Sequence, residues 1–175
     1  YFSRRINKKL NLSDVGHAPN LRSIYIENSS LCNLNCKFCG YKYRDQNLHP
    51  KKIMTIDQFK HAVDQAIKAK FNDVGLTPVT GDVYMDKGIE KKFDYVESQN
   101  QIKSFHFYTN LIPCSNKQIE SLFSYNKITT IGISIYGLSL DSFKLFTESN
   151  EVAFNKLINN LEFLYDQLSS KKSNF

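Results

Sequence analysis

The alternation of strand-like and helix-like segments constrains this chain more than any other feature. Four short segments rich in β-branched and aromatic residues are each followed by a segment with apolar residues at helical spacing. The expected strands cover residues 23–28, 73–77, 104–110 and 129–136. Strands that alternate with helices form parallel sheets with right-handed crossovers. The sequence therefore predicts an α/β fold built from β/α units.

Local signals indicate where the intervening helices begin. Thr55 with Gln58, and Ser115 with Gln118, each show the spacing of a capping box ahead of an apolar helical pattern. Asp86 is expected to cap the helix that follows the second strand. These signals fix the helix starts independently of the hydrophobic pattern.

Three cysteines follow the first expected strand in the run Cys-Asn-Leu-Asn-Cys-Lys-Phe-Cys. Cys32, Cys36 and Cys39 can hold three corners of an iron–sulfur cube, which ordinarily takes four cysteine ligands. Since no fourth cysteine is close in the sequence, one iron would be open to a ligand that is not protein. A metal site with an open position performs chemistry, whereas a closed site mostly holds structure.

A structural zinc site is the alternative for the cysteine triplet. Its fourth ligand would come from Cys114, His49 or His17. Structural zinc sites usually present their ligands in pairs, which favours the cluster. For Cys114, which follows Pro113 after the third strand, a buried cysteine is a better explanation than a reactive thiol.

Length and composition fit one folded domain. The 175 residues, 41% hydrophobic and 23% charged, suffice for a core. The apolar runs are too short to cross a bilayer and the N-terminus does not resemble a secretory signal, so a cytoplasmic location is expected. Clustered cysteines there are typically metal ligands. With a net charge of +6, neither nucleic acid nor a membrane is an expected partner.

The chemically distinctive residues fall at the carboxyl ends of the expected strands. The cysteines follow the first strand, Thr80-Gly81-Asp82 follows the second, Asn110 closes the third, and Ser134 lies on the fourth. Active sites of parallel sheets and barrels gather at this rim. We therefore expect one site assembled from four separate loops.

The Cys-x3-Cys-x2-Cys loop, with Phe38 before its last cysteine, resembles the signature of the radical S-adenosylmethionine (radical SAM) enzymes. The resemblance extends from about Ser23 to about Leu164, with all four strand ends in the expected order. It implies a partial (β/α) barrel with parallel strands, of which about four of six β/α units are present. Residues 1–22 would form an N-terminal extension, and residues 23–175 a radical SAM core domain truncated at its C-terminal side.

The resemblance implies two cofactors. Cys32, Cys36 and Cys39 would each bind one iron of a 4Fe–4S cluster, whose open iron takes the amino and carboxylate groups of S-adenosylmethionine. An electron from the reduced cluster breaks the sulfonium C–S bond, and the resulting 5′-deoxyadenosyl radical removes hydrogen from a substrate. The protein places the cofactor and excludes competing reactions. A reducing partner such as a flavodoxin or ferredoxin is also implied.

The later motifs of the family suggest further cofactor-binding residues. Thr80-Gly81-Asp82 occupies the position of a Gly-Gly-Glu motif that contacts the methionine amino group, with threonine for the first glycine and aspartate for glutamate. Asn110 belongs to a Thr-Asn pair that resembles Thr-Asn-Gly. Ser134 is expected to hydrogen-bond the cofactor ribose.

Two residues of the cysteine loop complete the expected cofactor site. Phe38 is the aromatic residue of the signature, and Tyr41 matches a position whose backbone usually meets the adenine. The similarity therefore assigns residues from every strand end to one cofactor.

Two stretches of sequence suggest a substrate class. Pro-Val-Thr-Gly-Asp and Ile-Ser-Ile-Tyr-Gly are most similar to members with a cysteine-rich extension, the SPASM-type subgroup, which often modify peptides or proteins. A peptide or protein substrate is therefore expected. Two alternatives are a non-catalytic iron–sulfur binding module, which the altered glycine motif would suit, and an electron carrier whose open iron holds water or a small thiol.

Overall fold

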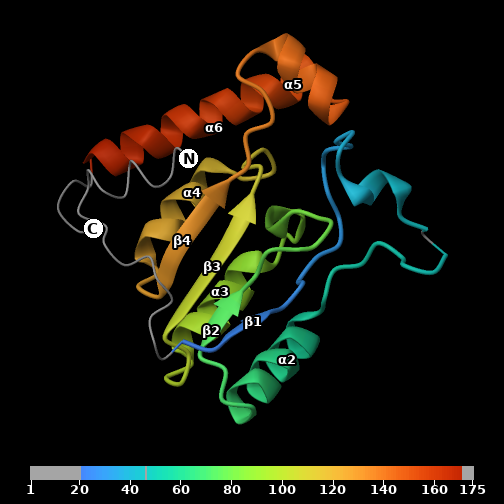
Figure 1. Ribbon diagram of the computed structural model, residues 1–175. Helices are drawn as coiled ribbons and strands as arrows, with labels where there is room; N and C mark the ends of the chain where they lie inside the picture. Colours follow the sequence, from blue (N-terminus) through green and yellow to red (C-terminus); the bar gives the residue numbers. More distant parts are fainter. Residues whose placement is uncertain (1–20, 46, 171–175) are drawn as a thin grey trace.

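The structure, a computed structural model, describes residues 21–45 and 47–170. Within this part the strands form one sheet in the order β1-β2-β3-β4, with every neighbouring pair parallel (Figure 1). The strands are β1 (Ser23–Tyr25), β2 (Asp73–Gly75), β3 (Ser104–Thr109) and β4 (Ile128–Ile133). The predicted α/β fold with parallel strands is confirmed. Residues 1–20 of the expected N-terminal extension lie outside the described residues.

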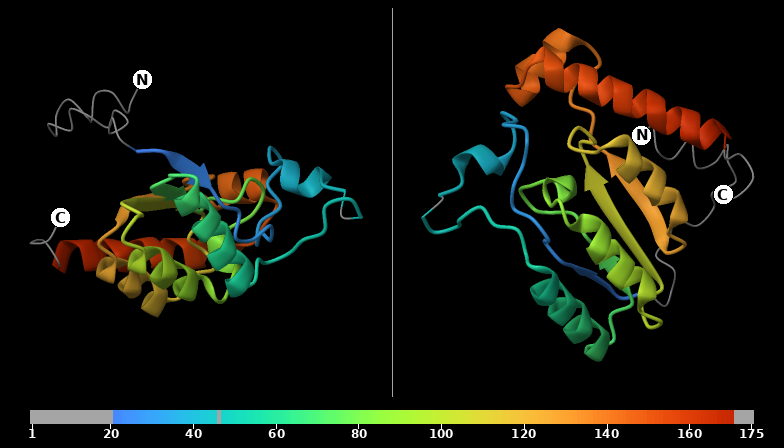
Figure 2. Two further views of the ribbon diagram at one scale, coloured as in Figure 1. Left: turned by 90° about the horizontal axis from the view of Figure 1, so that it is seen from below. Right: turned by 180° about the vertical axis from the view of Figure 1, so that it is seen from behind.

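A helical segment follows each strand, and Figure 2 shows α2, α3 and α4 on the same face of the sheet. The α-helices are α2 (Ile56–Lys68), α3 (Ile89–Ser98), α4 (Asn116–Ser121), α5 (Leu140–Thr147) and α6 (Glu151–Ser170). Three short 3-10 helices accompany them: η1 (Gly40–Tyr43), η2 (Val83–Met85) and η3 (Leu122–Ser124). None of the helices described is both long and apolar enough to cross a bilayer.

The two predicted capping boxes are confirmed. At the start of α2, Gln58 N donates to Thr55 Oγ1 at 3.2 Å and Thr55 N donates to Gln58 Oε1 at 3.0 Å. Ser115 and Gln118 make the same reciprocal pair at the start of α4. Each pair satisfies donors that a helix end would otherwise leave without partners.

The predicted cap at Asp86 is wrong. Gly88 is the N-cap of α3, and Gly88 N donates to Asp86 Oδ1 at 2.8 Å. The other carboxylate oxygen of Asp86 forms a buried ion pair with Lys92 Nζ at 2.5 Å. The aspartate therefore closes η2 and pairs with a lysine of α3, a contact that local sequence does not reveal.

The hydrophobic core lies between the sheet and its helices. Phe105 and Phe107 of β3 are fully buried, and Phe93 of α3 stacks on Phe107 with ring centroids 5.0 Å apart. Burying a side chain of this size stabilises the fold by about 1.5–3 kcal/mol. These contacts fix β3 against α3, and with it the end of β3 that faces the site.

The segment after β4 differs from the expectation. The strand ends at Ile133 instead of extending to residue 136, although Ser134 N still donates to Thr109 O at 2.8 Å. The chain then turns through Gly137, whose φ is +155°, and a Cβ there would lie 2.5 Å from Phe143 N. This close approach brings α5, an eight-residue helix, against the end of β4.

Candidate functional site

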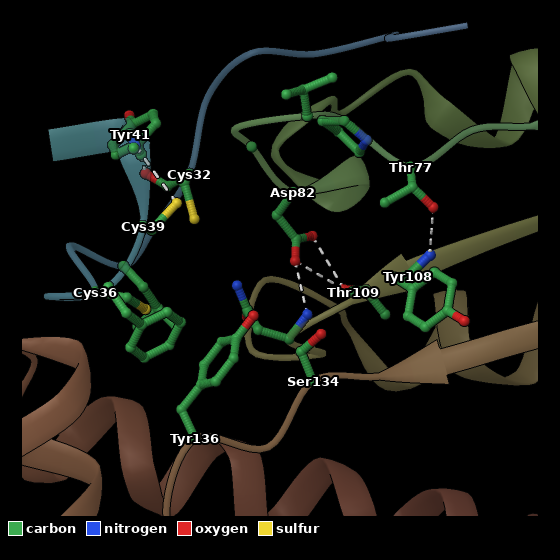
Figure 3. Close-up of a pocket in the computed structure, with 17 residues that line it drawn as sticks. Cys32, Cys36, Cys39, Tyr41, Thr77, Asp82, Tyr108, Thr109, Ser134 and Tyr136 are labelled. Atoms are coloured by element: carbon green, nitrogen blue, oxygen red, sulfur yellow. Dashed lines mark hydrogen bonds between the residues drawn. The ribbon is translucent and has the colours of Figure 1, made fainter. Parts of the chain in front are cut away.

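A cavity of about 370 Å³ opens at the carboxyl ends of the strands. Figure 3 shows the cysteine loop on one side of it and the segments after β2, β3 and β4 across from that loop. All three clustered cysteines line the wall, and so do six of the other predicted residues: Phe38, Tyr41, Gly81, Asp82, Asn110 and Ser134. The expectation of one site assembled from four loops agrees with this arrangement.

Thr80 is the predicted site residue that the structure leaves out of the cavity wall as described. Its hydroxyl oxygen accepts a hydrogen bond from Arg44 Nη1 at 3.0 Å. Because Arg44 Nε also donates to His49 O at 2.8 Å, the pair ties the segment after the cysteines to the loop after β2. Thr80 therefore supports the site from outside the described cavity wall, through its hydrogen bond with Arg44.

The cysteine loop is shaped by its own backbone. Cys39 N donates to Cys36 O at 3.0 Å, and Tyr41 N donates to Cys39 Sγ at 3.4 Å, so Cys39 caps η1. The Tyr41 hydroxyl donates to Cys32 O at 3.4 Å. Backbone N–H groups that point at cysteine sulfurs are among the features that tune iron–sulfur clusters.

Burial controls the protonation of the thiols. Desolvation raises the pKa of Cys32, and it raises the pKa of Cys36 to about 11 with a further contribution from the neighbouring cysteines. Both thiols are therefore protonated at neutral pH in the metal-free protein. A bound metal has to displace these protons, which couples metal binding to pH.

An amide pair holds the loop against the end of β3. Asn110 Nδ2 donates to Asn33 Oδ1 at 2.8 Å, and Asn33 Nδ2 donates back to Asn110 Oδ1 at 3.3 Å. Asn33 directly follows the first cysteine of the cluster motif. The predicted site residue Asn110 therefore positions the cysteine loop, and its amide is already engaged.

The end of α5 holds the loop at a second place. Asn35 N donates to Thr147 O at 3.2 Å, and Lys37 N donates to Phe146 O at 2.9 Å. The next residue, Glu148, has a left-handed φ of 50°. This conformation ends the helix and turns the chain beside the loop.

The carboxylate of Glu148 completes this second anchor. It accepts hydrogen bonds from Asn35 Nδ2 at 2.7 Å and from Lys42 Nζ at 2.9 Å. Lys42 lowers the pKa of Glu148, which is consistent with an ionised partner. One residue after α5 therefore fixes both the cysteine motif and η1.

Asp82 is the most heavily bonded side chain of the wall. Asp82 is 2% exposed, and its carboxylate accepts hydrogen bonds from Asn110 N at 2.7 Å and Thr109 Oγ1 at 3.0 Å (Figure 3). It also accepts one from Tyr84 N at 3.0 Å. Burial raises the pKa of Asp82, and the three donors oppose that shift. The residue predicted to contact a cofactor amine thus also joins the loop after β2 to the end of β3.

Gly81 is required by crowding. A Cβ at this position would lie 2.8 Å from Ser29 O and 2.9 Å from Leu31 O, both backbone atoms of the segment that leads into the cysteines. The neighbouring Asp82 N donates to Leu31 O at 2.7 Å. The glycine therefore lets the loop after β2 pack directly on the cysteine segment.

Tyr136 and Tyr108 line the cavity, although sequence reasoning left Tyr136 undecided and did not select Tyr108. The Tyr136 ring packs on Phe38 with centroids 5.0 Å apart. Burial raises the pKa of Tyr136, and the three cysteines contribute to that rise. The ring of Tyr108 occupies space that Gly132 leaves on the next strand, since a Cβ at Gly132 would lie 2.2 Å from it. A glycine beside an aromatic residue on neighbouring strands was the available signal.

Three thiols on one loop fit three corners of an iron–sulfur cube. Among the described residues, no three His, Cys, Asp or Glu side chains converge to hold one metal ion. The corners of an iron–sulfur cube are different irons, so its thiolates need not converge. Three residues were candidates for the fourth ligand of a zinc site. Cys114 is 1% exposed and lies outside the described cavity wall, His49 is exposed, and His17 lies outside the described residues.

Fold and site together define a parallel α/β protein with three thiols at the carboxyl ends of its strands. The sequence matches the Radical SAM superfamily over residues 27–170. The chain therefore belongs to the radical SAM superfamily, whose members bind a 4Fe–4S cluster and S-adenosylmethionine.

Two enzymes of similar sequence agree with this membership. GTP 3′,8-cyclases from two strains of Clostridium perfringens are each 28% identical to this chain over 116 residues, which cover 66% of the chain. The match spans 35% of the length of those relatives.

Solved structures show the same fold. The anSMEcpe complex with AdoMet and the Kp18Cys peptide has a TM-score of 0.62 at 19% identity, covering 82% of this chain and 40% of that one. Streptococcus suis SuiB has a TM-score of 0.60 at 17% identity, with 90% and 40% covered. BtrN in complex with AdoMet and 2-DOIA has a TM-score of 0.56 at 17% identity, with 65% and 45% covered.

Proposed function

We propose that this chain is the core of a radical SAM enzyme in which Cys32, Cys36 and Cys39 hold the 4Fe–4S cluster. The observation that carries the proposal is the cavity, because it places these three cysteines opposite a polar wall from three other strand ends. When bound, the cluster and S-adenosylmethionine together supply a 5′-deoxyadenosyl radical that removes hydrogen from a substrate. A flavodoxin or ferredoxin would provide the reducing electron.

Other residues of the cavity would bind separate parts of S-adenosylmethionine. Gly81 and Asp82 would hold the amino group of the cofactor's methionine, since a carboxylate suits an ammonium. Ser134 offers a hydroxyl for the ribose, Asn110 holds the cysteine loop at the cofactor site through Asn33, and the backbone of Tyr41 would meet the adenine. Apart from Asn33, these residues line the same cavity as the thiols.

For the substrate class we propose a peptide or protein. Val79 and Tyr108 line the cavity while 86% and 51% exposed, so the wall offers apolar surface to a large partner. The fold likeness to anSMEcpe bound to a peptide supports this choice. The similarity to GTP 3′,8-cyclases supports a nucleotide as the second candidate.

Reductive cleavage of the cofactor tests the proposed activity. After anaerobic reconstitution with iron and sulfide, dithionite and S-adenosylmethionine should yield 5′-deoxyadenosine and methionine. Cys36→Ala should abolish both the cluster and the cleavage, whereas Cys114→Ala should retain them because that thiol lies outside the described cavity wall. A cluster that never cleaves the cofactor would instead identify a binding module or an electron carrier.

A further inference from the structure

Among the residues that the structure describes, positive charge is concentrated in one segment next to the cysteines. Residues 37–45 and 47–52, which we call the basic segment, contain five cationic residues and a single acidic one, Asp45. In residues 53–170 acidic residues outnumber basic ones, 14 to 11. The cations of the basic segment are Lys37, Lys42, Arg44, Lys51 and Lys52. The net charge of the chain is therefore unevenly distributed along the sequence.

The basic segment extends away from the rest of the fold. In Figure 1, η1 and residues 47–52, which precede α2, lie outside the sheet and the helices that cover it. Lys37, Lys51 and Lys52 are exposed, and Tyr43 and Leu48 are each 73% exposed. Aromatic residues such as Tyr43 are enriched at protein interfaces, and exposed lysines around them can attract a partner of opposite charge.

Among the described residues, one cation of the basic segment forms an ion pair with a carboxylate: Lys42 Nζ lies 2.9 Å from Glu148 Oε1. Lys51 instead lies over the Tyr41 ring, with Nζ 4.3 Å from the centroid. The charge of the others is thus available to an external partner.

The basic segment also lies directly behind the thiols. The ring of Tyr41 is in contact with Lys51 on one side, and its hydroxyl donates to Cys32 O. The backbone N of the same tyrosine donates to Cys39 Sγ at 3.4 Å. A partner bound on the basic segment would therefore be separated from two proposed cluster ligands by one residue, and electron transfer is fastest over such short paths.

We infer that the basic segment is the docking surface for an acidic electron-carrier protein that reduces the site. This inference rests on the proposed function, because a reducing partner is needed only if the cysteines hold a redox cluster. Complementary charge accelerates encounter and fixes orientation, and the interfaces of electron-transfer complexes are small. A compact surface with unpaired cations meets both requirements.

Binding to the metal-free protein provides the first test. A purified acidic flavodoxin is titrated with the full chain at low ionic strength, and binding is followed by flavin fluorescence. K51E/K52E should weaken binding by about tenfold or more, and added salt should weaken the wild type because exposed charges are screened. The matched control, K68E/K103E, reverses two exposed lysines at the opposite ends of the strands and should bind like the wild type.

Cofactor cleavage provides the second test. With flavodoxin as donor, K51E/K52E should lose most of the rate of 5′-deoxyadenosine release, whereas with dithionite it should match the wild type because both lysines are exposed and lie outside the cysteine motif. Equal flavodoxin-dependent rates in both double variants would overturn the docking surface while leaving the enzyme intact. Tighter binding of single-stranded RNA than of flavodoxin to the basic segment would also overturn it. Failure of the wild type with dithionite would instead remove the proposed function.

Discussion

Replacing Asp82 by alanine should lower the free energy of unfolding of the metal-free protein by about 2–4 kcal/mol. The substitution leaves two buried N–H groups, of Tyr84 and Asn110, without their acceptor. Each buried donor without a partner costs about 1–3 kcal/mol. Burial also raises the pKa of the Asp82 carboxyl, because the buried carboxylate has lost its hydration. Alanine removes this desolvation cost, so the expected loss lies in the lower half of the range obtained by adding the costs of the two donors.

Two further variants separate hydrogen bonding from charge. Asp82→Asn keeps one acceptor oxygen and the side-chain shape, so about half the loss of Asp82→Ala is expected. Asp45→Ala is the matched control, since the Asp45 carboxylate also accepts from backbone donors, Asn47 N at 2.8 Å and Leu48 N at 3.4 Å. Asp45 is exposed, so water replaces it and the change should stay within about 0.5 kcal/mol.

Urea-induced unfolding followed by circular dichroism measures these differences. The midpoints should fall in the order wild type and Asp45→Ala, then Asp82→Asn, then Asp82→Ala, with an unchanged slope. An Asp82→Ala midpoint equal to that of Asp45→Ala would refute the view that this carboxylate joins the loop after β2 to β3. Asp82 would then serve the cofactor alone.

Three other changes probe the remaining supports of the site. Gly81→Ala should cost about 1–3 kcal/mol of stability and lower the iron bound after reconstitution, because its Cβ meets backbone oxygens; a fully loaded, equally stable variant would contradict this. Glu148→Ala should leave the unfolding midpoint nearly unchanged yet speed iron release to a chelator, since it frees Lys42 and Asn35; equal release rates would refute the second anchor. Burial raises the pKa of the Cys114 thiol, so it should resist iodoacetamide at pH 8 in the folded protein; rapid alkylation would contradict its burial.

The sequence predicted the elements that depend on local pattern. The capping boxes at Thr55 and Ser115 are confirmed because both partners lie within one helical turn. The parallel direction of the strands is confirmed because alternation with helices allows few topologies. Helix α5 has a weaker sequence signal, because eight residues show little of the helical period and its capping pair, Ser139 with Ser142, lacks the usual Glu or Gln.

The contacts that organise the site could not be predicted in this way. Asp82 meets Thr109 and Asn110 across 27 and 28 residues of sequence. Glu148 meets Asn35 across 113 residues. Such partners follow from the packing of separate β/α units, so sequence motifs located the rim of the sheet but not which side chains there bond to one another.

The most direct test of the central proposal is a Mössbauer spectrum of protein reconstituted with 57Fe, recorded with and without S-adenosylmethionine. Three cysteine ligands on a four-iron cluster leave one iron that differs from the others. We expect the signal of that iron alone to change when the cofactor is added. Four irons that are all unaffected by the cofactor, or purified protein that holds zinc in place of iron, would contradict the assignment of Cys32, Cys36 and Cys39.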